Sequence, residues 1–490
     1  MRALDEFSKT APATDAPARQ AQPAGLGRLL LHHAGERDGS GFALLTSGRD
    51  ALLALHDLAA ASERTLDLQY YIWRKDDAGR LLMSALLQAA DRGVRVRILL
   101  DGWEPSWSDD EIAELSAHRN LEIRLFNPAL GRRNRLLDLL RDPGRVNHRM
   151  HNKAFIADGA VAVVGGRNVS DRYFAIRSDG NYRDLDLFVA GPLVTRVTAS
   201  FEAFWGSRWS VSPAPGVGCS KELTAFRESL RVRLETAGEH PLATPPGTPV
   251  DRLAARLPAL IWADAAYLAV DPPSKAATSE PSLLREVRRR LSGTLDTELL
   301  VESAYFIPRG EALRALCRLA GSGVRIRVLT NSLQSSDAAT TYAGYRRIRP
   351  RLLRCGVELY ELQGPGGLAE EDHRILGRTT SAKLHSKAAV IDGRYVIVGS
   401  FNADARSVNL NTEIAFLIDS PELAGQVAGF IGAGMAGDVA YRPALRDGRI
   451  AWRAEDPGGG ERELRREPGW TVWRGLWLRL LSILPIDDQI

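Results

Sequence analysis

Apolar and polar residues alternate along the chain with two different periods, one typical of strands and one typical of helices. Residues 65–73 (TLDLQYYIW) have the pattern of a buried strand, and residues 93–101 (GVRVRILLD) alternate strongly, as a strand does. Apolar residues at helical spacing precede these strands, at 47–61 and 79–92. Strands that alternate with helices predict α/β architecture, in which helices cover a mixed or parallel sheet.

The same succession of elements begins again in the second half of the chain. Residues 297–308 (TELLVESAYFIP) parallel the first of these strands, and residues 323–331 (GVRIRVLTN) match residues 93–101 almost position for position. A further strand is predicted at 120–127 and again at 355–362. The copies lie 234 residues apart, which is too long for a solenoid unit and indicates a duplicated domain.

Changes in composition divide the chain into five parts. Proline-rich phrases such as PAPG, ATPPGTP and VDPPSK interrupt regular elements between the two halves, where only residues 262–275 resemble a strand, ending on a loop. We expect a disordered leader at 1–27, a first domain at 28–212, a connector at 213–283, a second domain at 284–455 and a C-terminal amphipathic tail at 456–490.

The tail contains the phrase GWTVWRGLWLRLLSILPI, which has an amphipathic helical pattern with arginines beside its apolar face. Tryptophan and arginine on such a helix are typical of a membrane interface. Packing of the same face on the protein core is an equally good interpretation, and both stay open. The apolar face is formed by Trp470, Trp473, Trp477, Leu480, Leu481 and Leu484.

Composition narrows the class of protein. The chain has 490 residues, 44% hydrophobic and 25% charged, as expected of a globular protein with more than one core. Its net charge of +4 is a mild indication of anionic partners. No run approaches the roughly 18 apolar residues of a membrane-spanning helix, and the leader lacks the apolar core of a signal peptide. Cys219, Cys317 and Cys355 lack C-x-x-C spacing, which predicts no disulfide or zinc site and favours a reducing compartment.

Residues 149–168 (RMHNKAFIADGAVAVVGGRN) contain the chemistry around which the chain is organised. His151, Lys153 and Asp158 stand in the order H-x-K-x-x-x-x-D, and Asn168 follows the histidine by 17 residues, 168 − 151. Alternate side chains share one face of an extended strand, so the imidazole and the ammonium group are expected on the same side.

Residues 383–402 (KLHSKAAVIDGRYVIVGSFN) repeat this pattern with His385, Lys387, Asp392 and Asn402. The asparagine again follows its histidine by 17 residues, 402 − 385. One such motif is expected by chance in roughly a few per cent of chains of this length. Two copies in matching strand–turn–strand contexts are therefore a strong signal.

These residue types suit attack on a phosphodiester. A phosphodiester needs cations beside its non-bridging oxygens, a nucleophile, and an acid for the leaving alkoxide. The two lysines supply charge, the two asparagines supply hydrogen bonds, and the two histidines divide the nucleophile and general-acid roles. Because neither half contains both histidines, the site is expected where the halves meet. No metal or cofactor is required, since the side chains carry the positive charge.

Several carboxylates have predicted supporting roles. Asp158 and Asp392 fall at the hairpin turn after each motif strand, where we expect them to fix the turn and backbone. The imidazoles need carboxylates to hold their orientation. Asp184 and Glu413, each on the strand that follows its own motif, are the candidates, with Asp186 as an alternative to Asp184.

Three other features are given structural interpretations. His148 has no counterpart in the second half and is predicted to be a structural or rim residue. Lys275, in DPPSK, is predicted to be a loop lysine. The arginine-rich segment 131–145 suits lipid headgroups and a solvated helix face equally well.

The paired phrases HNKAFIAD…GGRN and HSKAAVID…GSFN resemble the two HKD motifs of the phospholipase D superfamily, over nearly the whole chain after the leader. RMHNKAFIADGAVAVVGGRNVSDRYF, LTNSLQSSDAATTYAGY and LPIDD are similar to bacterial cardiolipin synthases of the ClsC type. The resemblance implies two duplicated α/β/α sandwich domains with pseudo-twofold symmetry and the active site at their interface. It also implies a ping-pong reaction with His151 as nucleophile and His385 as acid and then base, an order that the residues alone leave open.

The implied activity is transfer of a phosphatidyl group from phosphatidylethanolamine to phosphatidylglycerol. The expected partners are anionic and zwitterionic phospholipids and the membrane surface, with the protein cytoplasmic and peripherally associated with the inner (plasma) membrane. Some relatives carry an N-terminal hydrophobic segment that is missing here. A hydrolase acting on phospholipids or nucleic acid is the alternative, although +4 over 490 residues is weak for nucleic acid, which is not expected as a partner. A non-catalytic lipid-binding scaffold is disfavoured because both motifs are intact.

Overall fold

The computed structural model describes most of the chain, including both motifs. Residues 1–24, 35–36, 38, 104–105, 129–141, 213–223, 225–226, 233–245, 276–281, 292, 366, 377–379, 457–458 and 477–490 fall outside the described part. The predicted leader lies outside it except for residues 25–27, which begin helix α1 (Gly25–Ala34).

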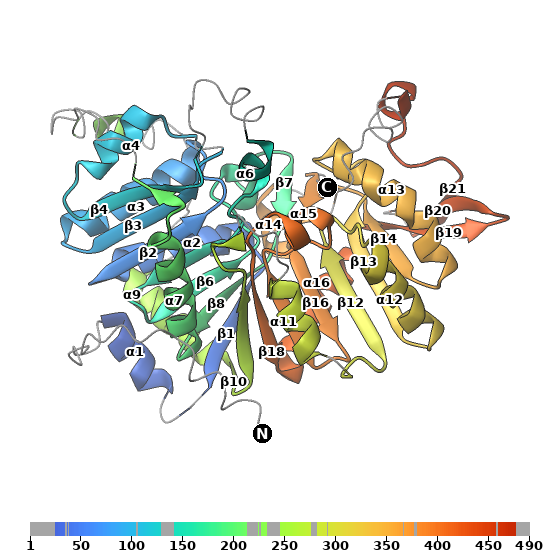
Figure 1. Ribbon diagram of the computed structural model, residues 1–490, viewed down its shortest axis with the longest axis horizontal. Helices are drawn as coiled ribbons and strands as arrows, with labels where there is room; N and C mark the ends of the chain where they lie inside the picture. Colours follow the sequence, from blue (N-terminus) through green and yellow to red (C-terminus); the bar gives the residue numbers. More distant parts are fainter. Residues whose placement is uncertain are drawn as a thin grey trace.

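Each half of the chain builds one large mixed sheet, and the two sheets lie side by side (Figure 1). The first contains, in spatial order, β10 (Ile261–Ala263), β1 (Ser40–Leu45), β8 (Asp186–Ala190), β6 (Val161–Gly165), β5 (Ala154–Ala157), β2 (Thr65–Tyr70), β3 (Arg95–Asp101), β4 (Leu121–Phe126) and β9 (Ser210–Val211). The second contains β11 (Ala266–Val270), β18 (Ile414–Asp419), β17 (Tyr395–Gly399), β16 (Lys387–Ile391), β12 (Glu298–Ser303), β13 (Arg325–Asn331), β14 (Glu358–Leu362), β19 (Ala440–Arg446), β20 (Arg449–Glu455) and β21 (Glu461–Leu464).

The order from β1 to β9 equals the order from β11 to β19, strand for strand. Each sheet contains three neighbouring parallel strands. In the first sheet β2 pairs with β3 and β3 with β4, and in the second β12 pairs with β13 and β13 with β14. The flanking pairs, such as β5 with β6 and β16 with β17, are antiparallel. The predicted duplication and the mixed α/β class are therefore confirmed.

Helices cover both faces of each sheet. In the first half α2 (Gly48–Ala61) and α3 (Asp77–Asp91) pack against one face and α7 (Leu193–Trp205) against the other. In the second half α12 (Gly310–Gly321) and α13 (Ala339–Arg354) share one face, and α16 (Pro421–Gly434) covers the other. The shorter elements are α4 (Asp109–Ser116), α6 (Pro143–Asn147), α9 (Pro249–Arg256), α11 (Ser282–Arg290), α14 (Glu370–Leu376), α15 (Ala405–Asn409), η2 (Asp171–Tyr173) and η3 (Leu257–Ala259).

Side chains at the helix starts explain where the helices begin. The Ser47 hydroxyl accepts a hydrogen bond from the Asp50 backbone N–H at the start of α2, and the Asp76 carboxylate accepts one from Gly79 at the start of α3. Helix α4 begins with a capping box between Ser108 and Glu111. These caps satisfy backbone N–H groups that a helix leaves without internal partners.

The two halves share a hydrophobic core. The helices that face the boundary contribute Phe201 and Phe204 from α7 and Val427 and Ile431 from α16 to a single cluster of buried residues. A second link is β7 (Asn181–Arg183), which pairs in parallel with β15 (Ala382–Leu384) of the other half. A continuous apolar core fixes the halves relative to each other, which a site built from both of them requires.

The segment between the halves is more regular than its proline content predicted. Residues 262–275 do not form one strand: β10 joins the first sheet beside β1, and β11 joins the second beside β18. The chain changes sheets at Asp264–Ala265, between these two short strands. Because β11 corresponds to β1 of the first half, the second sheet starts inside the predicted connector.

The prediction that the cysteines form no disulfide is wrong. Cys317 and Cys355 are joined by a disulfide, with their Cα atoms 5.2 Å apart. Cys317 lies in α12 and Cys355 directly follows α13, and both pack in the hydrophobic cluster on one face of the second sheet. A separation of 38 residues gave no sign of this, because tertiary packing brings the two helices together. Cys219 lies outside the described residues.

The part of the tail that the structure describes is partly packed on the core and partly exposed. Trp470 packs against the hydrophobic cluster of α12 and α13, whereas 80% of the Trp473 surface is exposed. Residues 472–476 are helical, and the rest of the predicted apolar face, from Trp477 onward, lies outside the described residues. Within the described segments, every helix falls short of the length and apolar character needed to cross a membrane.

Candidate active site

The two histidine motifs face each other across the boundary between the halves, and each is held by the backbone of the other half. His151 stands three residues before β5, and its N–H donates to the carbonyl of Thr412, 3.0 Å away. His385 lies between β15 and β16, and its N–H donates to the carbonyl of Arg183 at 2.8 Å. Backbone hydrogen bonds therefore help to position both imidazoles, independently of any side-chain contact.

Each imidazole is paired with a carboxylate from the opposite half. The Nδ1 atom of His151 lies 2.9 Å from Oε2 of Glu413, and Nδ1 of His385 lies 2.6 Å from Oδ2 of Asp184. Both carboxylates are buried. A carboxylate accepts the proton of Nδ1, which fixes the tautomer and leaves Nε2 to face a reacting group. The order of the chain alone does not reveal this exchange of partners.

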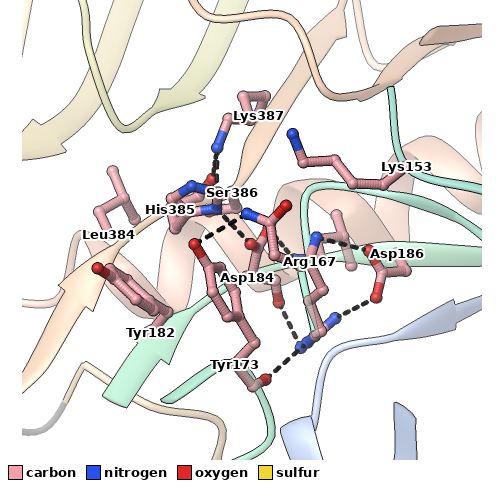
Figure 2. A network of polar contacts seen from close by, with 12 residues as sticks. Lys153, Arg167, Tyr173, Tyr182, Asp184, Asp186, Leu384, His385, Ser386 and Lys387 are labelled. Carbon is pink, nitrogen blue, oxygen red and sulfur yellow. Dashed lines mark hydrogen bonds and ion pairs between the residues drawn. The ribbon is translucent and has the colours of Figure 1, made fainter. Parts of the chain in front are cut away.

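Further polar groups hold the two carboxylates. Glu413 accepts hydrogen bonds from the hydroxyls of Ser400 and Ser407. One oxygen of Asp184 accepts the Leu185 backbone N–H at 2.8 Å. Asp186, the alternative to Asp184, instead forms an ion pair with Arg167, at 3.0 Å (Figure 2). These contacts place Asp184, and not Asp186, beside His385.

The two motif lysines are buried in the same site. Nζ of Lys153 donates to the carbonyl of His151 at 2.5 Å, and Nζ of Lys387 donates to the carbonyl of His385. Nζ of Lys387 also lies 3.0 Å from Nδ1 of His385. Figure 2 shows the Lys387 ammonium group directed toward His385 and the Lys153 side chain turned toward the same region. Burial lowers the pKa of both lysines, partly against the attraction of Asp184 and Glu413. An anion that enters the site would add to the attraction that Asp184 and Glu413 already exert on the two ammonium groups.

Burial also sets the charge state of the histidines and carboxylates. It lowers the pKa of His151 to about 4, although Glu413 acts in the opposite direction, and it lowers the pKa of His385. Burial alone would raise the pKa of Asp184, but the charges of His385, Lys387 and Arg167 outweigh it and lower the value to about 2. These pKa shifts favour neutral imidazoles beside ionised carboxylates near neutral pH.

The two asparagines differ in their surroundings. The side-chain oxygen of Asn168 accepts the Ile72 N–H at 3.1 Å, and its amide nitrogen donates to the Tyr173 hydroxyl at 2.9 Å. The side-chain oxygen of Asn402 is buried without a hydrogen-bond partner among the described residues. Such a group costs roughly 1–3 kcal/mol unless a ligand satisfies it. Because this oxygen is an acceptor, only a donor such as a substrate hydroxyl could satisfy it, and a phosphoryl oxygen could bond only to the amide nitrogen of Asn402.

Asp158 and Asp392 lie at the far end of the motif strands from the histidines. Five residues of extended chain separate Lys153 from Asp158, or roughly 16 Å at the usual strand rise. Asp158 accepts hydrogen bonds from the backbone N–H groups of residues 63–65. Asp392 accepts them from residues 296–298, and these bonds hold its pKa at about 2 against the effect of burial. Both aspartates tie the motif hairpin to the neighbouring strand.

Three tyrosines near the histidines were not identified from the sequence. The Tyr71 ring lies 5.3 Å from that of His151, and the Tyr173 and Tyr182 rings lie 5.0 and 5.2 Å from that of His385. Tyr173 and Tyr182 also stack on each other, with their centroids 4.6 Å apart. Tyr173 sits in the phrase VSDRYF directly after the first motif, which is the only signal that could have pointed to it.

The glycines beside the first asparagine allow the carboxylates to come close. A Cβ atom on Gly165 would lie 2.1 Å from an oxygen of Asp186, and one on Gly166 would lie 2.1 Å from an oxygen of Asp184. In the second half, a Cβ on Gly399 would lie 2.2 Å from the carbonyl oxygen of Ile414. Side chains at these positions would push the supporting strand away from the motif.

The remaining candidates have structural positions. Nδ1 of His148 lies 2.9 Å from the carbonyl oxygen of Leu410, at the boundary between the halves. Lys275 follows β11, where it is buried, and its Nζ donates to Asp271 at 2.7 Å and to the Ser407 carbonyl at 2.9 Å. Asp271 in turn accepts the backbone N–H of Glu413. Of the arginine-rich segment 131–145, residues 131–141 lie outside the described part.

Comparisons with known proteins agree with this geometry. A family described as cardiolipin synthase, PLD-like domain, matches residues 55–205 and 291–431, which contain the two motifs. The chain is 38% identical over 470 residues to cardiolipin synthase C of Escherichia coli (strain K12), covering 94% of this chain and 97% of that protein. It is 27% identical to a cardiolipin synthase of Geobacillus thermodenitrificans over 76% of this chain and 62% of the relative. The crystal structure of a phosphatidylserine synthase from Haemophilus influenzae Rd KW20 has a similar fold, with a TM-score of 0.59 at 12% identity over 94% of this chain and 98% of that one.

Proposed function

The chain belongs to the cardiolipin synthase family with phospholipase D-like domains and is a phosphatidyltransferase of that family, and on this premise we propose that it makes cardiolipin from phosphatidylethanolamine and phosphatidylglycerol. The observation that carries the proposal is the pair of histidines, each held by a carboxylate of the opposite half, with a buried lysine beside each. This arrangement provides two imidazole Nε2 atoms and two cations for one phosphodiester.

In the first step of the proposed reaction, Nε2 of His151 attacks the phosphorus of phosphatidylethanolamine. The bond between phosphorus and the ethanolamine oxygen breaks, and a proton from Nε2 of His385 passes to that oxygen, so that ethanolamine leaves. A phosphatidyl–histidine intermediate remains on His151. The lowered pKa of His151, about 4, supports its role as nucleophile, because the ring is neutral at physiological pH.

In the second step the terminal hydroxyl of phosphatidylglycerol takes the place that ethanolamine has left. Nε2 of His385, now without its proton, accepts the hydroxyl proton while the oxygen attacks phosphorus. The bond between phosphorus and His151 breaks, which releases cardiolipin and restores the first histidine. His385 thus acts as an acid in the first step and as a base in the second, as a transfer between two similar alcohols requires.

The two lysines and the amide nitrogen of Asn402 are proposed to donate hydrogen bonds to the phosphoryl oxygens. Their ammonium groups are buried, where a charge acts more strongly than in water. The substrate phosphate would offset the burial that lowers the pKa of His385 and of both lysines. Substrate binding is thus proposed to favour the protonated form of His385 that the first step needs.

The proposed substrates are membrane lipids, so the protein must work at a bilayer surface. We propose peripheral association with the inner face of the plasma membrane, supported by the basic net charge and by the exposed Trp473 of the tail. This proposal needs no membrane-spanning helix in the described part of the chain.

A lipid-product assay tests the proposed function. Purified protein is mixed with vesicles that contain phosphatidylethanolamine labelled in its phosphatidyl group together with unlabelled phosphatidylglycerol. Labelled cardiolipin and free ethanolamine are the expected products. Phosphatidic acid as the sole labelled product would identify a hydrolase, and cardiolipin that forms only with CDP-diacylglycerol would refute the proposed donor.

A further inference from the structure

We propose that a basic pocket at the outer edge of the second sheet binds the headgroup of an anionic phospholipid, as a docking site separate from the active site. The pocket has a volume of about 750 Å³ and lies between α13, β20 and residues 465–472. Pockets of roughly 300–1,000 Å³ are usual for small ligands. Its basic lining residues are Arg346, Arg349, Arg449, Arg465 and Arg466.

The charge of the pocket is strongly positive and only partly neutralised. Arg346 and Arg349 form ion pairs with Glu467, at 2.9 and 2.7 Å, and Arg349 also pairs with Glu361. Five arginines against these two carboxylates leave a net charge of +3. The pocket therefore has an excess of donors suited to a phosphodiester, which arginine binds through its planar fork.

The three arginines that carry this excess are Arg449, Arg465 and Arg466. All three are exposed, and within the described part of the chain none has a carboxylate at ion-pair distance. Arg449 begins β20, whereas the other two stand on the segment after β21, so the fold brings together charges from different elements. An anion at this place would not have to displace an existing ion pair.

Buried contacts hold the pocket floor rigid. Glu467 accepts hydrogen bonds from the Tyr342 hydroxyl, at 2.6 Å, and from Arg349. Trp452 donates through its ring N–H to Glu361 at 2.9 Å, and the Arg349 guanidinium lies 4.9 Å from its ring. A rigid floor lowers the entropy that a ligand must spend on ordering its site.

Apolar side chains stand at the rim of this pocket, which favours a lipid over a soluble phosphate. Thr471 and Val472 line the pocket, and the helical turn that they begin exposes Val472, Trp473 and Leu476 by 73%, 80% and 52%. Basic groups beside an exposed tryptophan and leucine match the anionic headgroups and acyl boundary of a bilayer. In Figure 1 this red segment projects from the second half beyond α13.

The pocket is distinct from the active site. The sheet order places four strands, β12, β13, β14 and β19, between the motif strand β16 and the pocket strand β20. Five steps at the usual strand spacing correspond to roughly 24 Å. Docking at the edge would tether the protein to the bilayer while leaving the two histidines free for substrates, so the inference deepens the proposed function.

Vesicle flotation of the full chain tests the proposal without turnover. Vesicles of phosphatidylcholine alone are compared with vesicles of phosphatidylcholine and phosphatidylglycerol. The triple variant Arg449→Gln, Arg465→Gln, Arg466→Gln should bind the mixed vesicles on the order of 100-fold more weakly, because each basic residue near an anionic surface strengthens binding by roughly fivefold. Thermal unfolding at the wild-type midpoint would show that the variant is folded.

A matched control removes three exposed arginines elsewhere, by Arg119→Gln, Arg285→Gln and Arg288→Gln. This control should bind mixed vesicles within roughly threefold of the wild type, since charges far from the contact are screened. An equal loss in the two triple variants would overturn the proposal, because binding would then follow net charge alone. Unchanged binding in the pocket variant would overturn it as well.

Two further variants separate the apolar rim and the active site. Trp473→Ser with Leu476→Ser should weaken binding to both kinds of vesicle by the same factor, so that the ratio of the two affinities is unchanged. Undiminished binding would show that the apolar rim does not contribute to the site. His385→Ala should keep the wild-type preference for phosphatidylglycerol while losing turnover. Loss of that preference would show that phosphatidylglycerol binds in the active site, and it would refute the proposed docking site. Failure of the lipid-product assay would refute the proposed reaction but would leave the flotation result unaffected.

Discussion

The imidazole of His385 is held by Asp184, a residue 201 positions earlier in the chain and in the opposite half, at 2.6 Å. His151 is held in the same way by Glu413, at 2.9 Å. Neither half therefore contains a complete pair of imidazole and carboxylate, even though each carries a full copy of the motif. The shared hydrophobic core that unites α7 and α16 is consequently part of what the site needs.

The contact between Asp184 and His385 predicts a large effect for Asp184→Asn. The variant keeps the volume but removes the negative charge that fixes the Nδ1 proton, so we expect kcat to fall by on the order of 100-fold or more. The rate of cardiolipin formation measures it. Asp419→Asn, which alters a surface carboxylate paired with Arg394, is the matched control and should leave kcat unchanged.

The order of the two histidines is tested with a phosphatidyl ester of p-nitrophenol. Nitrophenolate leaves without a proton, so the first step needs the nucleophile but no general acid. With His151 as nucleophile, His385→Ala should release a burst of one nitrophenol per enzyme, and His151→Ala should release none. The reverse pattern would exchange the two roles.

The lowered pKa of His151 predicts how stability depends on pH. The folded value, about 4, lies below the ordinary value of 6.5, so the unfolded chain binds the proton more tightly. The stabilising contribution is fully present above pH 6.5 and is lost as the pH falls through about 4. A shift of this size corresponds to roughly 3 kcal/mol.

Urea unfolding between pH 7 and pH 4 measures this contribution. His151→Asn, which cannot titrate in this range, should show a flatter profile than the wild type. Identical slopes in the wild type and His151→Asn would contradict the assignment.

Close approach at Gly166 predicts a severe effect for Gly166→Ala. The added methyl group would lie 2.1 Å from an oxygen of Asp184, so the carboxylate or the strand must move. We expect a loss of roughly 1–3 kcal/mol in the free energy of unfolding, together with reduced kcat. Gly429→Ala, in α16 with open space around the new methyl group, is the matched control and should be neutral or stabilising. Wild-type activity in Gly166→Ala would show that the spacing is not critical.

The disulfide between Cys317 and Cys355 predicts a dependence on reducing agent. It closes a loop of 38 residues, and loop entropy gives it roughly 4 kcal/mol of stabilisation. Cys317→Ser with Cys355→Ser should lower the unfolding midpoint by the same amount as reduction of the wild type does. If the reductant lowers the midpoint of the double variant as well, its effect lies elsewhere.

Local patterns in the sequence were enough to predict most helices and strands and the reacting groups. Strict alternation at 93–101 and 323–331 predicts β3 and β13, because strand side chains repeat every two residues. The two HKD motifs, equal in spacing, indicate the reacting groups and the duplication. The short strands β10 and β11 were not predicted as a pair, since two strands in different sheets have no common alternation.

By itself the sequence determined which residues are present twice, the α/β class, and the need for a site between the halves. Only the tertiary structure decided which carboxylate serves which histidine, that the carboxylates come from opposite halves, and that Cys317 meets Cys355. The reason is physical: local propensity acts over a few residues, whereas these contacts join residues 38 to 262 positions apart. The packing of α7 and α16 in one core sets such distances, and no short pattern encodes it.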